Sequence, residues 1–155
     1  MSFQIHAVDP AAFAPLFAMS EDELSGQFAR RVIADAKPGY PCRVSLQDAE
    51  PGETLILAHF MHQPANSPFR SSHAVYVREG AVPAELDPGD IPAQFSHRLM
   101  SVRAFDTAGM MRDADVVEGT SLRPVIDRML AAPETAELHL HYARPGCFAA
   151  RVTRA

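Results

Sequence analysis

The segment of residues 138–152 constrains the fold more than any other part of the chain. Its first half alternates apolar residues with His139 and His141. Successive side chains on a strand point to opposite faces, so the alternation predicts a strand with both histidines on one face and an apolar surface on the other. Pro145 presets φ and Gly146 accepts a positive φ, which predicts a tight turn. The segment should therefore fold into a hairpin.

Short strands and turn signals account for most of the remaining chain. Helices are expected over 21–36, after a capping-box pattern at Ser20 and Glu23, and over 122–132, where apolar residues form one stripe. Alternation or short apolar runs predict strands over residues 3–8, 42–46, 54–61, 72–78, 98–106 and 110–117.

The order of these elements predicts the fold class. Most strands follow one another without the helical crossover that parallel pairing needs. We therefore expect an α+β fold in which residues 1–155 form a single domain, with a mainly antiparallel, curved sheet and two principal helices. A mixed sheet is the alternative, because the 122–132 helix could serve as one crossover.

Composition excludes several classes of partner. The 155 residues, 47% of them hydrophobic, suit one globular domain, and the net charge of −5 offers no general attraction to nucleic acid or anionic lipid. The first residues lack a basic leader before an apolar core, and no run approaches the roughly 20 apolar residues of a membrane span. We expect a cytoplasmic protein in which Cys42 and Cys147 are free thiols, and no nucleic-acid or membrane partner.

Four stretches of the chain carry a family resemblance: residues 39–46, 48–53, 67–79 and 139–147. They contain the motifs Tyr-Pro-Cys-Arg-Val-Ser-Leu, Ser-Pro-Phe-Arg-Ser-Ser-His and His-Tyr-Ala-Arg-Pro-Gly-Cys. In combination they resemble the bacterial family known as domain of unknown function 1203. The resemblance implies a small, stand-alone bacterial protein, and it supplies neither a catalytic residue nor a cofactor.

Residues with useful chemistry concentrate at strand ends and turns. Arginine presents a planar fork that suits carboxylate or phosphate, and histidine, with a pKa near 6.5, supplies adjustable hydrogen bonds or transfers protons. Our leading hypothesis is therefore a pocket for a small anionic ligand. Its ligand-binding residues would be Arg43, Arg70, His73 and Arg144, and its candidate catalytic residues Cys147, His139 and His141.

An enzyme is the first alternative. Cationic neighbours lower a thiol pKa, so Cys147 beside two histidines and Arg144 could be a nucleophile, although free cysteine is also a common buried residue. The histidine pair could instead bind a metal ion, with Cys147, Cys42 or His73 completing the site. Because no CxxC or HExxH motif is present, we assign no metal ligand and favour two histidines hydrogen-bonded on a polar sheet face.

A self-associating protein is the second alternative. The terminal strand from Cys147 to Arg154 could be an uncovered sheet edge. Such an edge offers unpaired backbone groups to a second copy of the chain, which would give a homodimer.

The nucleophile hypothesis predicts the reactivity of Cys147. A thiolate held by imidazolium and Arg144 should react with an alkylating reagent faster than Cys42 at pH 6. Mass spectrometry from pH 5 to 9 would measure both rates, in the intact protein and in His139→Ala and His141→Ala. An undetectable Cys147 rate, or an ordinary thiol titration that neither substitution changes, removes the hypothesis.

Overall fold

The computed structural model describes residues 2–155, whose backbone contacts divide into two compact units. The first unit comprises the chain up to His6, Met61–His73 and Glu85–Ala155, and the second comprises Ala7–Phe60 and Ala74–Ala84. The described residues form eight strands in two antiparallel sheets, with a few short helices. The predicted α+β class is therefore confirmed, with two sheets in place of one.

The first unit contains a five-stranded sheet of order β1-β8-β7-β5-β6, in which all neighbours pair antiparallel. The predicted hairpin of β7 with β8 is confirmed, and β5 and β6 form a second hairpin. The strand bounds are β1 Phe3–His6, β5 Leu99–Phe105, β6 Met111–Glu118, β7 Glu137–Tyr142 and β8 Phe148–Arg154.

The turn between β7 and β8 forms for the reasons that its sequence indicates. Gly146 has φ +79°, a left-handed conformation that favours glycine. Its N–H donates to the carbonyl of Tyr142 at 2.8 Å, and the Tyr142 N–H donates to the carbonyl of Cys147 at 2.9 Å. These two bonds reverse the chain directly after the histidine pair.

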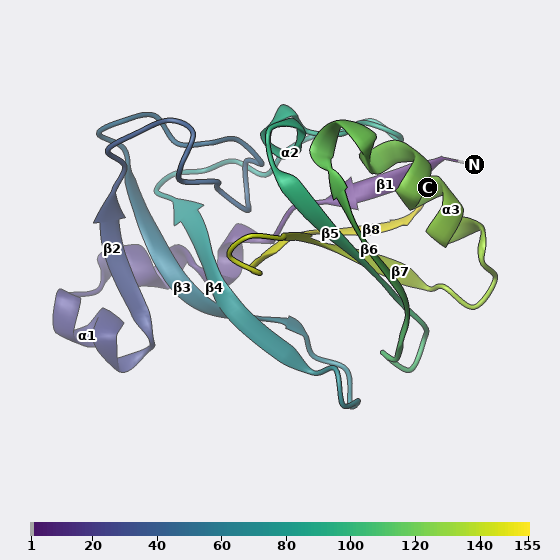
Figure 1. The fold of residues 1–155 in the computed structure, drawn as a ribbon. Coiled ribbons are helices and arrows are strands. Elements are labelled where there is room, and N and C mark those ends of the chain that lie inside the picture. The colour runs from purple at the N-terminus through teal and green to yellow at the C-terminus, as the bar shows by residue number, and fades with distance from the viewer. Residues whose placement is uncertain (1) are drawn as a thin grey trace. The chain divides into compact units, whose positions relative to one another are not determined.

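Helix α3 (Leu122–Ala131) packs on the five-stranded sheet in the first unit (Figure 1). Its buried residues form one stripe that includes Ile126 and Leu130. Leu138 and Leu140 of β7 are completely buried as well. Because side chains alternate along β7, the two histidines lie on the opposite face from these leucines. Helix α2 (Ala93–Ser96) and a 3-10 turn, η3 (Gly119–Ser121), complete the first unit.

The second unit is built on the sheet β2-β3-β4. Its central strand, β3, begins at Thr54 as predicted, and β3 and β4 continue into the first unit through Met61–Gln63 and Ser71–His73. The elements are η1 Pro10–Ala12, η2 Ala14–Ala18, α1 Glu21–Gly26, β2 Ala29–Ile33, β3 Thr54–Gln63 and β4 Ser71–Arg78.

The helix predicted over 21–36 is wrong beyond its first turns. The capping box forms, since the Ser20 hydroxyl accepts from the Glu23 N–H at 3.2 Å and the Glu23 carboxylate accepts from the Ser20 N–H at 2.7 Å. The helix nevertheless ends at Gly26, Phe28 takes φ +55°, and the chain continues as β2 against β3. This long-range pairing outweighs the local helical period.

The strand predicted over 42–46 is also wrong. The Leu46 N–H donates to the carbonyl of Cys42 at 3.1 Å, which makes this segment a turn, and only isolated bridges occur near it. Leu46 has φ +54°, which no strand accommodates.

The uncovered edge predicted over Cys147–Arg154 is wrong as well, because β8 pairs with β1 on one side and β7 on the other. Cys42 and Cys147 form no disulfide, as expected. Among residues 2–155, every helix is too short or too polar to cross a membrane.

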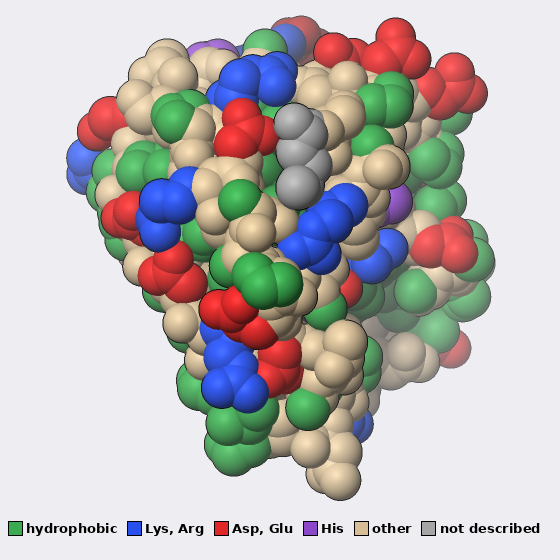
Figure 2. Space-filling model, turned by 90° about the vertical axis from the view of Figure 1, so that its right-hand side faces the viewer, with side chains coloured by type: hydrophobic (Ala, Val, Ile, Leu, Met, Phe, Trp, Pro, Cys, Tyr) green, Lys and Arg blue, Asp and Glu red, His purple; other side chains and the backbone are tan. Residues whose placement is uncertain are grey.

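Figure 2 shows acidic and basic side chains lying beside one another on the face that it draws. Within the first unit, one group of opposite charges joins α3 to β6. There the guanidinium of Arg128 donates to Asp113 at 2.7 Å and to Asp115 at 2.9 Å. These two aspartates are therefore paired with a cation.

Gly119 tests the packing of the first unit. A Cβ at this position would lie 1.7 Å from the carbonyl oxygen of Phe95, so Gly119→Ala forces the backbone to move. We expect the free energy of unfolding to fall by about 3 kcal/mol. Gly26→Ala is the control, since a Cβ there meets nothing within 4 Å. Urea unfolding of both variants would measure the difference, and equal stability would contradict this packing.

Candidate functional site

Three histidines meet in the first unit, and we call them the histidine cluster. His62 comes from the end of β3, and His139 and His141 come from β7. Their ring centroids lie 6.0 Å apart for His62 and His139, 4.9 Å for His62 and His141, and 6.5 Å for the β7 pair. Each ring offers one nitrogen as a possible metal ligand, and these three nitrogens lie within 4.8 Å of one another.

Burial and aromatic packing hold the histidine cluster in place. His139 and His141 are each 1% exposed, because β7 lies between β5 and β8. The ring of Phe148 stacks on His62 at 5.0 Å with the planes 5° apart, and the ring of Phe105 lies 4.8 Å from His139. The cluster therefore sits on rigid strands with apolar walls.

Hydrogen bonds determine which ring nitrogens carry protons. Nε2 of His139 lies 3.0 Å from a carboxylate oxygen of Glu137, and Nδ1 of His141 lies 3.1 Å from the carbonyl oxygen of Gly146. Carboxylate and carbonyl oxygens only accept, so both of these nitrogens carry hydrogen. In the neutral rings, the lone pairs are then on Nδ1 of His139 and Nε2 of His141.

Three buried nitrogens of the cluster have no hydrogen-bond partner among residues 2–155. They are Nδ1 of His62, Nδ1 of His139 and Nε2 of His141. On the β7 pair, these are the same nitrogens that hold the lone pairs. Leaving a buried polar group unpaired costs about 1–3 kcal/mol, so three in one place are unusual for a purely structural cluster.

Glu137 orients the cluster from one side. Its second carboxylate oxygen accepts from Nη1 of Arg151 at 3.2 Å. The hydrogen bond from His139, followed by the one from Arg151, holds the pKa of Glu137 below its usual range despite partial burial. The residue is therefore a carboxylate, which fixes the orientation of the His139 ring.

Two rings of the cluster are neutral at neutral pH. Burial is the main cause that lowers the pKa of His62 to about 4, with further effects from the charges of His139, Arg103 and His73. Burial also lowers the pKa of His141 to about 3, with Arg103 as the next cause. A neutral imidazole keeps the lone pair that metal binding requires.

Arg103 is the cation beside the cluster. In the β5–β7 register it lies opposite His139, and Ser101 lies opposite His141, so all four side chains share one face. Nε of Arg103 donates to the Ser101 hydroxyl at 3.3 Å. Burial lowers the pKa of Arg103. Within the described chain, this guanidinium forms no ion pair with a carboxylate.

The cluster has the donor set of a transition-metal site with three protein ligands. Zinc binds imidazole at about 2.0–2.1 Å in a tetrahedral arrangement, which places ligand nitrogens about 3.3 Å apart. The ligand atoms of the cluster, which lie within 4.8 Å of one another, would have to move closer together to reach this spacing. Three such ligands leave a fourth coordination position open.

The three arginines of the predicted pocket differ in their burial and in the unit to which they belong. Arg70 and Arg144 are exposed, and Arg70 donates to the carbonyl of Pro64. Arg43 belongs to the second unit, where it is 1% exposed and donates to the carbonyl of Pro41 at 2.6 Å. Their role in ligand binding stays a prediction.

His73 and Cys147 belong to the first unit, together with the cluster. His73 is partly buried at the start of β4, and its charge contributes to the low pKa of His62. Cys147 is 8% exposed just before β8. The group that could hold a metal does not include either residue, and the role of Cys147 as a nucleophile stays a prediction.

Sequence reasoning missed His62 and Arg103. A signal for His62 existed, since His59 and His62 are an odd number of residues apart and must point to opposite faces of their strand. His59 is exposed, and His62 is partly buried. Arg103 gave no such signal, because its position opposite His139 depends on the register of β5 with β7.

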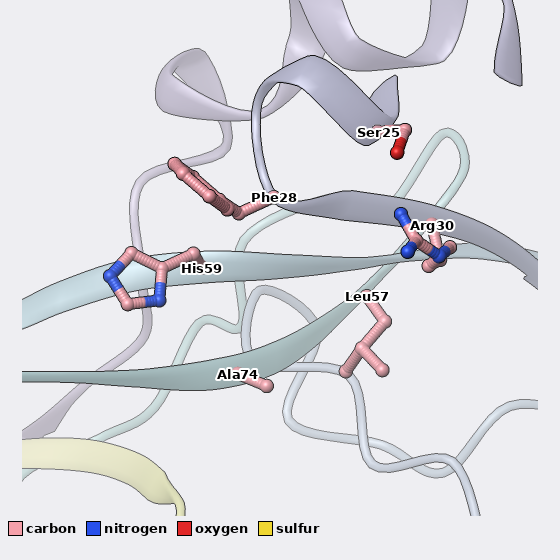
Figure 3. A pocket seen from close by; sticks show the side chains of 6 residues that line it. All are labelled: Ser25, Phe28, Arg30, Leu57, His59 and Ala74. Carbon is pink, nitrogen blue, oxygen red and sulfur yellow. The ribbon is translucent and has the colours of Figure 1, made fainter. Parts of the chain in front are cut away.

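A second candidate is a shallow pocket of about 330 Å³ in the second unit (Figure 3). The ring of Phe28 meets that of His59 edge to face at 6.1 Å. Phe28, Leu57 and Ala74 give the lining its apolar half, and Ser25, Arg30 and His59 its polar half. Its lining residues are Ser25, Phe28, Arg30, Leu57, His59 and Ala74.

The fold and site together define an α+β protein with a buried cluster of three histidines. The chain belongs to the family described as "Protein of unknown function (DUF1203)", whose model matches residues 39–154. The family resemblance of the sequence is thus confirmed, and the matched residues include the whole cluster and Arg103. No curated protein and no solved structure matches the chain.

The low pKa values predict how stability depends on pH. The unfolded chain titrates these rings near pH 6.5, whereas His62 and His141 in the folded chain titrate at about 4 and about 3. Unfolding therefore takes up protons below pH 6.5, and the free energy of unfolding should decrease as the pH falls from 6.5 to 4. One proton corresponds to about 1.4 kcal/mol per pH unit, with His141 contributing most because it is more buried.

His141→Phe should reduce the proton uptake on unfolding by about one proton. The variant lacks the imidazole that is neutral in the folded chain and becomes protonated on unfolding below pH 6.5. Urea unfolding between pH 4 and 8, with a chelator throughout, would measure it. His59→Phe changes an exposed histidine of β3 and should keep the wild-type slope. An unchanged slope in His141→Phe would show that this ring is charged in the folded chain.

Proposed function

We propose that this protein binds a divalent transition-metal ion, with zinc as the best-suited ion, through His62, His139 and His141. The observation that carries the proposal is the convergence of three histidine rings, each of which has one buried nitrogen without a hydrogen-bond partner among residues 2–155. Imidazole nitrogen is a favourable ligand for zinc, copper, iron and nickel.

The hydrogen bonds around the cluster support this proposal over a purely structural role. Histidines that ligate metals usually donate their other ring N–H to a carboxylate or a backbone carbonyl. His139 donates to Glu137, and His141 donates to the carbonyl of Gly146. A cluster that served only to connect strands would gain stability by pairing its remaining buried nitrogens as well.

The anionic ligand expected from the sequence is retained in a revised form. We propose Arg103 as the arginine that binds it at the histidine cluster, because its register with His139 brings it beside the cluster. We propose that the ligand is a small molecule. The bacterial origin, the cytoplasmic location and the homodimer also remain proposals.

Metal titration tests the proposed function. Isothermal titration of chelator-treated protein with zinc should show one site per chain. His62→Ala, His139→Ala and His141→Ala should each weaken binding by at least about 100-fold, since each removes one of three ligands. Glu137→Gln should weaken it by about 10- to 100-fold, because the ligand His139 loses its carboxylate partner.

His59→Ala is the matched control for these variants. It removes an exposed histidine from the same strand as His62, so zinc affinity should stay at the wild-type value. Zinc should also raise the thermal unfolding temperature of the wild type and of His59→Ala, because ligand that binds the folded chain stabilises it. Equal affinity in all five variants would overturn the proposal.

A further inference from the structure

We infer that the metal site carries a small oxyanion, a carboxylate or a phosphate, with one oxygen on the metal and a second on the guanidinium of Arg103. This inference rests on the proposed function, because the metal supplies one of the two contacts. The position of Arg103 is what makes this inference specific to the histidine cluster. Arg103 is directly opposite His139 across the β5–β7 pair, on the face that carries all the ligands from β7.

The free donors of Arg103 point to an anion. A guanidinium has five N–H donors in a planar fork, which matches two oxygens of a carboxylate or phosphate. The described structure uses one of them, Nε, at 3.3 Å from the Ser101 hydroxyl. A partly buried arginine whose terminal nitrogens have no carboxylate partner within residues 2–155 is available for an external acid.

The charges around the cluster favour the same ligand. Neutral imidazoles do not compensate a divalent ion, so the bound metal would add two positive charges beside Arg103. Glu137 is the carboxylate in contact with the cluster, and it is shared between His139 and Arg151. An oxyanion at the open coordination position would offset this excess of positive charge.

The surroundings limit the size of the ligand. The rings of Phe105 and Phe148 pack against the histidines, and His62 and Arg103 are only partly buried, whereas His139 and His141 are buried. A ligand that reaches both the metal and Arg103 among these packed rings should be small. Acetate and inorganic phosphate are therefore suitable probes, and they distinguish a carboxylate ligand from a phosphate ligand.

Cobalt(II) makes the test visible, because its absorption band responds to the number and kind of its ligands. The protein is first loaded with Co(II), and loading is measured from the band itself. Acetate, inorganic phosphate and chloride at matched ionic strength are then titrated separately. We expect acetate or phosphate to change the position and intensity of the band with saturation, and chloride at the same concentrations to have a smaller effect.

Variants of Arg103 separate the two contacts. Arg103→Met should bind Co(II) as the wild type does, but raise the apparent Kd of the oxyanion by about tenfold or more, since it loses a charge-assisted hydrogen bond. Arg103→Lys keeps the charge without the fork and should give an intermediate Kd. Arg112→Met changes an exposed arginine of β6, which pairs with Asp106 in the turn before that strand. This variant should behave as the wild type.

Each outcome decides one of the two claims. A response to acetate alone identifies a carboxylate, and a response to phosphate alone identifies a phosphate. Co(II) binding without any response to oxyanions, or an Arg103→Met response equal to that of the wild type, overturns the inference and leaves the metal site standing. Absence of Co(II) binding in the wild type overturns both.

Discussion

The pairing of β7 between β5 and β8 is the constraint on which the rest of the first unit depends. It buries both faces of β7, so Leu138 and Leu140 occupy one side and His139 and His141 occupy the other. Apolar side chains are stabilised by this burial, whereas imidazoles lose their contact with water. The fold must therefore satisfy the histidines from within, and it does so for only one nitrogen of each β7 ring.

The hydrogen bonds that the two β7 histidines do form follow a chemical pattern. Glu137 and the carbonyl of Gly146 are acceptors, and each takes the N–H of one ring. Arg151 holds Glu137 from the other side, so the orientation of His139 depends on a chain of charged hydrogen bonds. The turn that supplies the Gly146 carbonyl is itself fixed by a positive φ. These contacts thus determine which nitrogens of the two rings are left without a partner among residues 2–155.

Sequence patterns predicted this part of the structure because its determinants are local. Alternation and a Pro-Gly turn are contained within residues 138–152, and both are found. The helix predicted over 21–36 was wrong because its outcome depended on a distant partner, β3, to which residues 29–33 pair. The same reason explains the candidate site. The β7 pair was identified, whereas His62 and Arg103 join it only through strand pairings that no local pattern specifies.

A metal at the histidine cluster would connect parts of the first unit that are far apart in the sequence. His62 belongs to the segment Met61–His73, whereas the other two ligands come from β7 near the end of the chain. In the described structure, stacking on Phe148 is among the contacts that hold the His62 ring beside them. A metal ion would form bonds to nitrogens that otherwise have no partner. It would also close a long loop of chain, and closing a long loop restricts the unfolded state more than closing a short one does. Under the proposed function, metal binding and the stability of the first unit would therefore be coupled. The buried nitrogens that cost stability without a ligand would become a source of stability with one.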